Sequence, residues 1–450
     1  MNYVSVTDAQ RSEMLARVGV SSVDDLFDDI PDTVLLKSAP EVEGGMSEID
    51  LTVRLRELAA ANTAAHQYVS FAGAGCYDHY IPAFIDHLLR RPEFFTAYTP
   101  YQPEVSQGTL QAIYEYQTGI CELTGLDVAN ASMYDGATAL VEAAFMAVRL
   151  SRGKRTKVLV SQAIHPEKIE TMMTYAESGL IEPIIIPLAD DLVTDVAAFS
   201  TLLEEHGPDT GAVLLPYPNY YGIVEDIAPL IAAAREAGAS VVLDTHPLML
   251  GILKSPAALG AQIAVGEGQP LANPMSFGGP GLGYFACCQK CVRQMPGRLV
   301  GKTIDVDGKT GYVLTLATRE QHIRREKATS NICSNHALNA LAAGMYLAAA
   351  GTEGLREIAL DCVSKAHYLH DALLSTGLFE QAGPSTAPFG YEFALRYLGE
   401  KDLSLWHDEL LEAGYLAGVL LDDKLVLFAA TEKRTRAEID AFVEEVRRHG

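Results

Sequence analysis

Five short runs of valine, isoleucine and leucine alternate with helical stretches through the middle of the chain. The runs cover residues 157–161, 183–187, 211–216, 239–244 and 262–265. Uninterrupted apolar runs are typical of strands that are covered on both faces, so they predict a mostly parallel sheet. The stretches 195–206 and 228–237 have amphipathic or alanine-rich helical patterns, and Gly238 follows the second as a helix stop. The pattern therefore indicates the α/β class.

The segments on either side of this region have different patterns. Residues 7–66 contain acidic, mainly helical stretches at 7–18, 22–29 and 47–63. After residue 335 the sequence predicts long helices at 337–350 and 354–375, a strand pair at 391–397 and 424–430, and a closing helix at 436–448. We expect a helical N-terminal arm (1–70) that packs on a neighbour, a large α/β domain (71–335) and a small α+β domain (336–450).

Composition and charge argue against several classes of function. With 34 Lys and Arg against 58 Asp and Glu, the net charge is −24. This charge repels nucleic acid, because no basic patch offsets it. The longest apolar helical stretch, 337–350, is too short to span a bilayer, and residues 1–8 lack the pattern of a secretory leader. We expect a cytoplasmic protein with no membrane or nucleic-acid partner.

The cysteines predict neither a disulfide framework nor a metal centre. There are seven, an odd number spread over the chain. Cys288 and Cys291 form a CxxC pair, but no second ligand pair follows at the spacing of a structural zinc site. We therefore expect buried thiols and no metal site.

Polar residues stand at two predicted element ends where ligands commonly bind. Asp135 and Gly136 open a helix that continues over 138–150, and the free N–H groups of a helix start bind anions such as phosphate. The alternative is a plain helix capped by Asp135 or Thr138. The carboxylate of Asp135 would also repel a phosphate. Asp244 and His246 end a predicted central strand, at the ligand-binding edge of doubly wound sheets. In pyridoxal-phosphate enzymes such an aspartate keeps the pyridine nitrogen protonated, whereas elsewhere it is often a turn or cap residue.

Two loops rich in aromatic residues, glycine and proline precede the sheet, at 71–82 and 94–108. Their polar side chains are typical of a structured loop that lines a cleft, with packing of the rings in the core as the alternative. The candidate residues are Tyr77, His79, Tyr98, Tyr101, Gln102, Glu104 and Gln107.

Two further segments have a marked composition. The glycine-rich turn at 273–283 enters a strand and lacks the Lys-Ser/Thr of a P-loop, so its glycines favour close approach of the backbone to a ligand or another chain. The basic segment 319–333 predicts a helix with charge pairs four residues apart. The alternative is that Arg324, Arg325 and Lys327 face an anionic ligand.

With four of these segments, 71–82, 98–108, 278–280 and 319–333, present in this order, the chain resembles the P-protein of the glycine cleavage system, glycine dehydrogenase (decarboxylating). The segment 98–108 reads Tyr-Thr-Pro-Tyr-Gln-Pro-Glu-Val-Ser-Gln-Gly. In length and in the acidic arm at 21–31 the chain is similar to the alpha subunit of the two-subunit bacterial form.

The resemblance implies a pyridoxal-phosphate-dependent transferase fold of the aminotransferase type, and a heterotetramer of two alpha and two beta subunits. It also implies a reaction in which glycine and the lipoyl group of H-protein give CO2 and an aminomethyl-dihydrolipoyl arm. The cofactor ring serves as the electron sink of such reactions.

One position departs from the catalytic pattern of the family. The cofactor is held by a lysine, which in the catalytic subunit lies eleven positions before the proline of the Gly-Gly-Pro turn. Counted from Pro280, that position is Gln269. We therefore expect no covalent cofactor in this chain, with Asp135, Gly136, Asp244 and His246 as the remains of a site. Pyridoxal phosphate is then expected on the beta subunit.

Under this interpretation the seven loop candidates line an active site shared with the beta subunit. Two alternatives stay open. The chain could be an independent pyridoxal-phosphate amino-acid decarboxylase or desulfurase that uses Lys254 or Lys302. It could also be a non-catalytic subunit with a structural or regulatory role.

Overall fold

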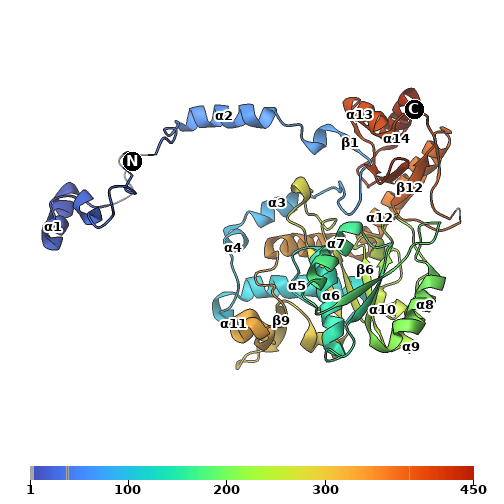
Figure 1. Cartoon of the computed structure of the whole chain (residues 1–450), viewed down its shortest axis with the longest axis horizontal. Coiled ribbons are helices and arrows are strands. Elements are labelled where there is room, and N and C mark those ends of the chain that lie inside the picture. Colours follow the sequence, from blue (N-terminus) through green and yellow to red (C-terminus); the bar gives the residue numbers. More distant parts are fainter. Residues whose placement is uncertain (1–4, 37, 39, 385) are drawn as a thin grey trace. The chain divides into compact units, whose positions relative to one another are not determined.

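The computed structural model describes residues 5–36, 38, 40–384 and 386–450. The chain divides into two compact units, Met1–Thr63 and Ala64–Gly450, and each is described by itself (Figure 1). The expected boundary between the large and small domains, at residue 335, lies inside the second unit and stays a prediction.

The first unit contains, within its described residues, α1 (Asp8–Val18), the 3-10 helix η1 (Asp24–Phe27) and α2 (Glu48–Ala60). Thr7 and Ser47 cap the two α-helices, because each side-chain oxygen accepts from the backbone N–H three residues ahead. The helix expected at 22–29 is only a short turn. Asp25 accepts hydrogen bonds from the backbone and hydroxyl groups of Ser21 and Ser22, and these bonds compete with a longer helix.

The second unit is built on a seven-stranded sheet in the order β2-β8-β7-β6-β5-β3-β4. The strands β3 to β7 run parallel, whereas β8 and β2 are antiparallel to their neighbours. Each of the five predicted runs forms one of these strands, so the mostly parallel sheet is confirmed. The strands are β2 (Val128–Ala129), β3 (Lys157–Ser161), β4 (Glu182–Ile186), β5 (Thr210–Tyr217), β6 (Ser240–Thr245), β7 (Ile263–Glu267) and β8 (Gly283–Cys287).

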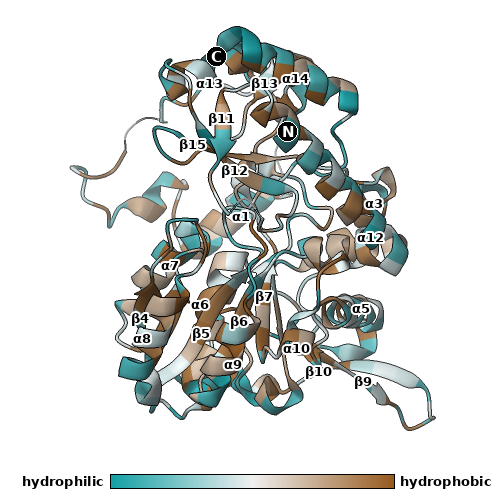
Figure 2. Cartoon of the chain, turned by 90° about the vertical axis from the view of Figure 1, so that its right-hand side faces the viewer, coloured by the Kyte–Doolittle hydropathy of each residue, from teal (hydrophilic) through white to brown (hydrophobic). Residues whose placement is uncertain are grey.

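Helices cover both faces of this sheet. In β5, Leu214 packs in a cluster with α6 and α7, whereas Val213 and Leu215 pack on the other face with α8 and α9. Figure 2 shows β5, β6 and β7 side by side as mainly hydrophobic ribbons. The helices are α6 (Gly136–Leu150), α7 (Pro166–Ala176), α8 (Val196–His206), α9 (Ala228–Glu236) and α10 (Pro256–Leu259). Burial on both faces explains why the runs lack polar alternation.

Longer helices cover one face of the sheet at β7 and β8. Here α5 (Gln107–Thr124) packs with the first half of α12 (Ala337–Leu374). The two helices expected at 337–350 and 354–375 are the halves of α12, separated at Gly351 by a positive φ of 61°. The short helices α3 (Ala83–Leu89) and α4 (Pro92–Phe95) precede them. No helix among the described residues is long and apolar enough to cross a membrane.

The C-terminal residues form a second sheet, antiparallel, in the order β11-β12-β15-β14. The predicted strand pair is confirmed, because β12 and β15 pair with Phe393 opposite Phe428. Phe71 and Tyr77, from the first aromatic loop, pack in the core of this sheet. The elements are β1 (Val69–Ser70), which pairs with β13 (Tyr415–Leu416), and β11 (Phe379–Gln381), β12 (Glu392–Tyr397), β14 (Val419–Leu420), β15 (Leu425–Ala429), α13 (Leu403–Glu412) and α14 (Arg436–His449).

The basic segment 319–333 is not the helix that the sequence predicts. It follows the hairpin of β9 (Leu299–Ile304) and β10 (Thr310–Thr315) and forms short turns, among them η8 (Ala317–Arg319), α11 (Gln321–Arg324) and η9 (Arg325–Lys327). The guanidinium of Arg319 donates to the carbonyls of Met295, Gly297 and Leu316, which fixes an irregular backbone. The other 3-10 turns are η2 (Ala65–Gln67), η3 (Pro103–Val105), η4 (Gly207–Asp209), η5 (Met249–Gly251), η6 (Ser276–Gly278) and η7 (Gln289–Gln294).

Candidate functional site

A cavity of about 850 Å³ lies at the carboxyl ends of β5, β6 and β7, the edge at which α/β proteins bind ligands. The residues that follow β6, the end of β7 and the starts of α6 and α7 form its wall, together with the glycine-rich turn. The sequence candidates that line this cavity are Tyr77, Asp135, Gly136, Asp244, His246 and Gln269.

The carboxylate of Asp244 is paired with an amine from α7. Lys168 Nζ lies 2.7 Å from Oδ1 and 2.8 Å from Oδ2 of Asp244. The two side chains are only 16% and 8% exposed. A buried carboxylate requires such a partner, because an unpaired charge in this environment is strongly unfavourable. Asp244 is thus neutralised by a residue of its own chain.

Two carboxylates occupy the start of α6. Asp135 Oδ1 accepts from the N–H of Thr138 at 2.7 Å, as the alternative of a plain capped helix predicts. Glu267 Oε2 accepts from the N–H of Gly136 at 2.9 Å. Glu267 Oε1 accepts from the N–H groups of Gln269 and Leu282 at 2.9 and 2.7 Å. One carboxylate therefore holds three backbone donors at the position that the sequence suggested for an anion.

Gln269 is buried, and both ends of its amide are bonded. Its Oε1 accepts from the N–H of Tyr77 at 3.1 Å, and its Nε2 donates to the carbonyls of Tyr77 and Asn273 at 3.1 and 2.8 Å. The side chain joins the first aromatic loop to the segment after β7. Gln269 thus has a structural function in the wall of this cavity.

Two buried hydrogen bonds of the cavity wall reach the small sheet. The Tyr77 hydroxyl donates to Glu392 Oε2 at 2.8 Å, and Ala74 N–H donates to Glu392 Oε1 at 2.6 Å. Burial raises the pKa of Glu392 to about 7 although both bonds oppose the shift.

Burial, followed by the charges of His79 and Lys168, lowers the pKa of His246 well below its ordinary value. We therefore assign a neutral imidazole whose Nε2 accepts from the Tyr391 hydroxyl at 2.5 Å.

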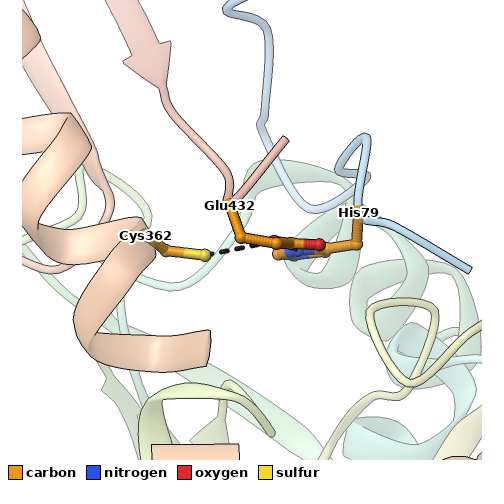
Figure 3. A group of neighbouring side chains, drawn as sticks. All are labelled: His79, Cys362 and Glu432. Carbon is orange, nitrogen blue, oxygen red and sulfur yellow. Dashed lines mark hydrogen bonds and ion pairs between the residues drawn. The ribbon is translucent and has the colours of Figure 1, made fainter. Parts of the chain in front are cut away.

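His79 lies beyond this wall, in a buried group with Glu432 and Cys362 (Figure 3). Its Nδ1 lies 2.7 Å from Glu432 Oε2, and Cys362 Sγ donates to the same oxygen at 3.3 Å. Burial acts to raise the pKa of Glu432, but the hydrogen bond and charge of His79 hold it at about 2. The separation of 2.7 Å between His79 Nδ1 and Glu432 Oε2 is that of a hydrogen bond.

Of the candidates between residues 98 and 107, Tyr98 lines a second, apolar cavity of about 220 Å³, between this loop, α5 and the start of α12. The Tyr98 hydroxyl lies 3.3 Å from Ser334 Oγ. The guanidinium of Arg298 donates to the Tyr101 hydroxyl at 3.1 Å and lies 5.4 Å from the centre of its ring. Tyr98 and Tyr101 nevertheless remain 78% and 50% exposed, so their hydroxyl ends are fixed while the rings face solvent.

Of the remaining loop candidates, Gln107 holds the loop in place by hydrogen bonds, and the other two are exposed. Gln107 Nε2 donates to the carbonyls of Pro103 and Tyr312, and its Oε1 accepts from the N–H of Tyr312. This amide fixes the loop to β10. Gln102 and Glu104 are exposed. The structure thus does not gather the seven candidates in one cavity, since Tyr77 lines the first cavity and Tyr98 lines the second.

The lysines and cysteines named from the sequence lie elsewhere. Lys254 and Lys302 are exposed and line neither of the two cavities. The thiols of Cys288 and Cys291 are free and 3.1 Å apart. Burial, followed by the hydrogen bond between the two thiols, raises the pKa of Cys291 to about 12, so the thiol form is favoured.

Known proteins resemble the chain over nearly its whole length. The family described as Glycine cleavage system P-protein matches residues 1–446. The probable glycine dehydrogenase (decarboxylating) subunit 1 of Geobacillus kaustophilus is 48% identical over 450 residues, which cover 99% of this chain and 98% of the relative. The chain belongs to the glycine cleavage system P-protein family.

Solved structures support the same assignment for this P-protein family member. An inhibitor-bound glycine decarboxylase (P-protein) of the glycine cleavage system superposes with a TM-score of 0.89 at 44% identity and covers 100% of both chains. A C-DES variant with glycine covalently linked to its PLP cofactor has a TM-score of 0.63 at 16% identity, over 86% of this chain and 100% of the other. The second likeness shows the fold alone. The predicted pyridoxal-phosphate transferase fold is confirmed.

The cofactor that this fold implies does not fit the residues of this P-protein family member. A phosphate needs free N–H groups at the start of α6, but Glu267 and Asp135 accept from Gly136 and Thr138 there. A protonated pyridine nitrogen needs the carboxylate of Asp244, which is paired with Lys168. At the position where the resemblance leads us to expect the family's lysine, this chain has Gln269.

The sequence analysis did not select three residues that line the cavity of this P-protein family member: Lys168, Glu267 and Glu392. Glu267 is the last residue of β7 and lies two positions after the predicted run 262–265, so an argument like that for Asp244 would have selected it if the strand had been predicted to its full length. Lys168 follows His165 and Pro166 at the start of α7, which weakly indicates the carboxyl edge of β3. Glu392 interrupts an apolar strand of the small sheet, and the sequence does not show that this strand reaches the cavity.

Proposed function

We propose that the chain is the alpha subunit of glycine dehydrogenase (decarboxylating) and acts with a beta subunit that supplies the cofactor lysine. The complex converts glycine and lipoylated H-protein to CO2 and aminomethyl-dihydrolipoyl H-protein. The observation that carries this proposal is Gln269, at the position where the catalytic subunit needs a lysine. The full-length similarity to a probable subunit 1 supports it.

The assembly is part of the proposal. A subunit 1 implies a second subunit, and we propose two alpha and two beta chains, with pyridoxal phosphate bound by beta. Lipoylated H-protein and glycine are the substrates of the complex, and the compartment is the cytoplasm. Neither nucleic acid nor a membrane takes part.

The chain's own contribution to the shared active site is assigned to the loop at 98–107. Tyr98, Tyr101, Gln102 and Glu104 are exposed, so they are able to reach a partner. The hydroxyl ends of the two tyrosines are held by Ser334 and Arg298, which reduces the entropy lost when the loop contacts a partner. Gln107 supports the loop from β10, and the buried Tyr77 and His79 support the neighbouring loop.

The test of the missing cofactor uses the chain purified without beta. After incubation with pyridoxal phosphate and reduction with borohydride, we expect no stoichiometrically modified lysine and no absorbance at about 410–430 nm. The beta subunit treated in the same way is the positive control. One fully labelled lysine, whether Lys168, Lys254 or Lys302, would instead identify an independent pyridoxal-phosphate enzyme.

A second measurement separates a shared active site from a purely structural or regulatory subunit. Exchange of the carboxyl carbon between glycine and bicarbonate is measured for beta with and without this chain. We expect exchange to require both chains, and to fall in loop variants that still assemble. Full exchange by beta alone would favour the structural alternative.

A further inference from the structure

We propose that this chain replaces the two charged ends of a bound cofactor with its own side chains, Lys168 at the pyridine end and Glu267 at the phosphate end. The inference rests on the proposed function in one respect, that the cofactor belongs to the partner. It goes further by assigning two residues that keep the cavity folded without a ligand and closed to phosphates.

At the pyridine end, Lys168 supplies what a protonated ring nitrogen supplies elsewhere. Both are cationic N–H donors, and both neutralise the aspartate at the end of the central strand. Lys168 Nζ lies within 2.8 Å of both oxygens of Asp244, so the carboxylate is satisfied from within the chain. Lys168 is the third residue of α7, which begins at Pro166, so the start of this helix places the amine at this edge of the sheet.

At the phosphate end, Glu267 supplies the anion. Its carboxylate accepts from three backbone N–H groups, among them that of Gly136 in the first turn of α6, where the helix dipole favours negative charge. The approach is close, since a Cβ at Gly136 would lie 2.9 Å from the backbone nitrogen of Glu267. A Cβ at Gly281 would lie 2.9 Å from Glu267 Oε2. The glycines therefore let the chain close around its own carboxylate.

The two replacements reproduce one pattern of charge. A cation faces Asp244 and an anion faces the start of α6, as in a site that holds pyridoxal phosphate. The carboxylate and the helix start thus have partners whether or not a ligand is present. A phosphate that entered would have to displace Glu267 and would meet the charge of Asp135, which caps the same helix.

Thermal melting of the full chain in phosphate tests the assignment of Glu267 to the phosphate end. Between zero and 10 mM inorganic phosphate, at ionic strength matched with NaCl, we expect the wild type to shift by less than about 1 °C. Glu267→Ala frees three donors, so its melting temperature should rise by about 2–4 °C in phosphate. Glu167→Ala is the matched control, because Glu167 also lines the cavity but its carboxylate makes none of the described hydrogen bonds.

If Glu267→Ala does not fold, Glu267→Ser serves in the same test, because its hydroxyl still accepts from Gly136. A folded Glu267 variant that melts identically in phosphate and in chloride would overturn the assignment of Glu267. A rise in the wild type as large as in the variant would overturn it equally.

A double-mutant comparison tests the assignment of Lys168 to the pyridine end. Lys168→Met keeps the length of the side chain but leaves Asp244 unpaired, so we expect the melting temperature to fall by roughly 5 °C or more. Adding Asp244→Asn should return it to within about 2 °C of the wild type. A stable Lys168→Met variant, or a double variant no better than the single one, would overturn this assignment. These measurements need neither beta nor activity, so their failure leaves the proposed function to be judged by the borohydride test.

Discussion

Glu392 is a carboxylate of the cavity wall whose pKa is raised to about 7 by burial. It is buried, and its partners Tyr77 and Ala74 are neutral donors. A raised carboxyl pKa means that the folded protein binds the proton more tightly than the unfolded chain does. The stability contributed by Glu392 is therefore greatest below about pH 4.5 and is lost as the pH rises through about 7.

The variant Glu392→Gln tests this titration at the scale of one residue. The amide keeps an acceptor for Ala74 but does not ionise, so the variant should gain stability relative to the wild type as the pH rises from 5 to 8. We expect a change of at most about 3 kcal/mol in the difference between their unfolding free energies. Urea unfolding at each pH measures it, with the exposed Glu400→Gln as control. A constant difference between wild type and Glu392→Gln would contradict the pKa shift.

Among the elements, the loop at 98–107 has the geometry of a prepared surface. Gln107 fixes its end to β10, while Arg298 fixes Tyr101 near its middle. Preorganisation of this kind is valuable for a loop that contributes donors to a neighbour's active site, because the donors need no reorganisation during the reaction.

We expect Tyr101→Phe and Gln102→Ala to lower turnover of the reconstituted complex by roughly 10²–10³. Assembly and melting temperature should stay nearly unchanged, because both residues are exposed. Steady-state turnover with saturating H-protein measures the effect. Tyr175→Phe, on α7 and packed on Phe145, is the matched control. Native turnover in both loop variants would show that the loop is only structural.

The sheet was predictable from the sequence, because strands buried on both faces leave continuous apolar runs such as 211–216. The basic segment was not, because the acceptors of Arg319 include Met295 and Gly297, which lie more than twenty positions away. Asp244 and Gln269, which the sequence analysis singled out, line one cavity. It could not select Lys168, since only the packing of α7 against the end of β6 brings that amine to Asp244.

At the scale of the whole molecule, the N-terminal arm exposes most of the large apolar side chains between residues 14 and 30, which we call its apolar stripe. Met14, Val18, Val23, Leu26, Phe27 and Ile30 are each 38–65% exposed, and no residue of α1, η1 or α2 is buried. An exposed apolar surface of this extent is typical of an interface. We therefore predict that the arm binds the beta subunit.

Deletion of residues 1–45 should leave the second unit folded but weaken or abolish co-elution with beta in about 0.5 M salt. Interfaces of stable subunits bury upwards of roughly 2,000 Å² and are largely apolar, so salt alone should not separate the intact chains. Size-exclusion chromatography measures the association. Full co-elution of the truncated chain would place the partner surface elsewhere, first on the turn around Phe277.

A full-length pair of variants makes the same test without truncation. Leu26→Asp with Phe27→Asp places two charges on the stripe, whereas Arg17→Ala changes a polar position of the same arm. The first should weaken association and the second should not. Equal behaviour of the two variants would contradict an apolar interface.

The pairing of Lys168 with Asp244 also determines how the folded chain should respond to a shortage of the vitamin from which pyridoxal phosphate is made. An enzyme that needs pyridoxal phosphate to complete its fold depends on the vitamin from which the cofactor is made. A chain that supplies its own counter-ion does not. If the beta subunit holds the cofactor, as we propose, vitamin shortage should leave this chain folded while its partner lacks the cofactor. Restored supply should then revive the complex without new synthesis of this chain.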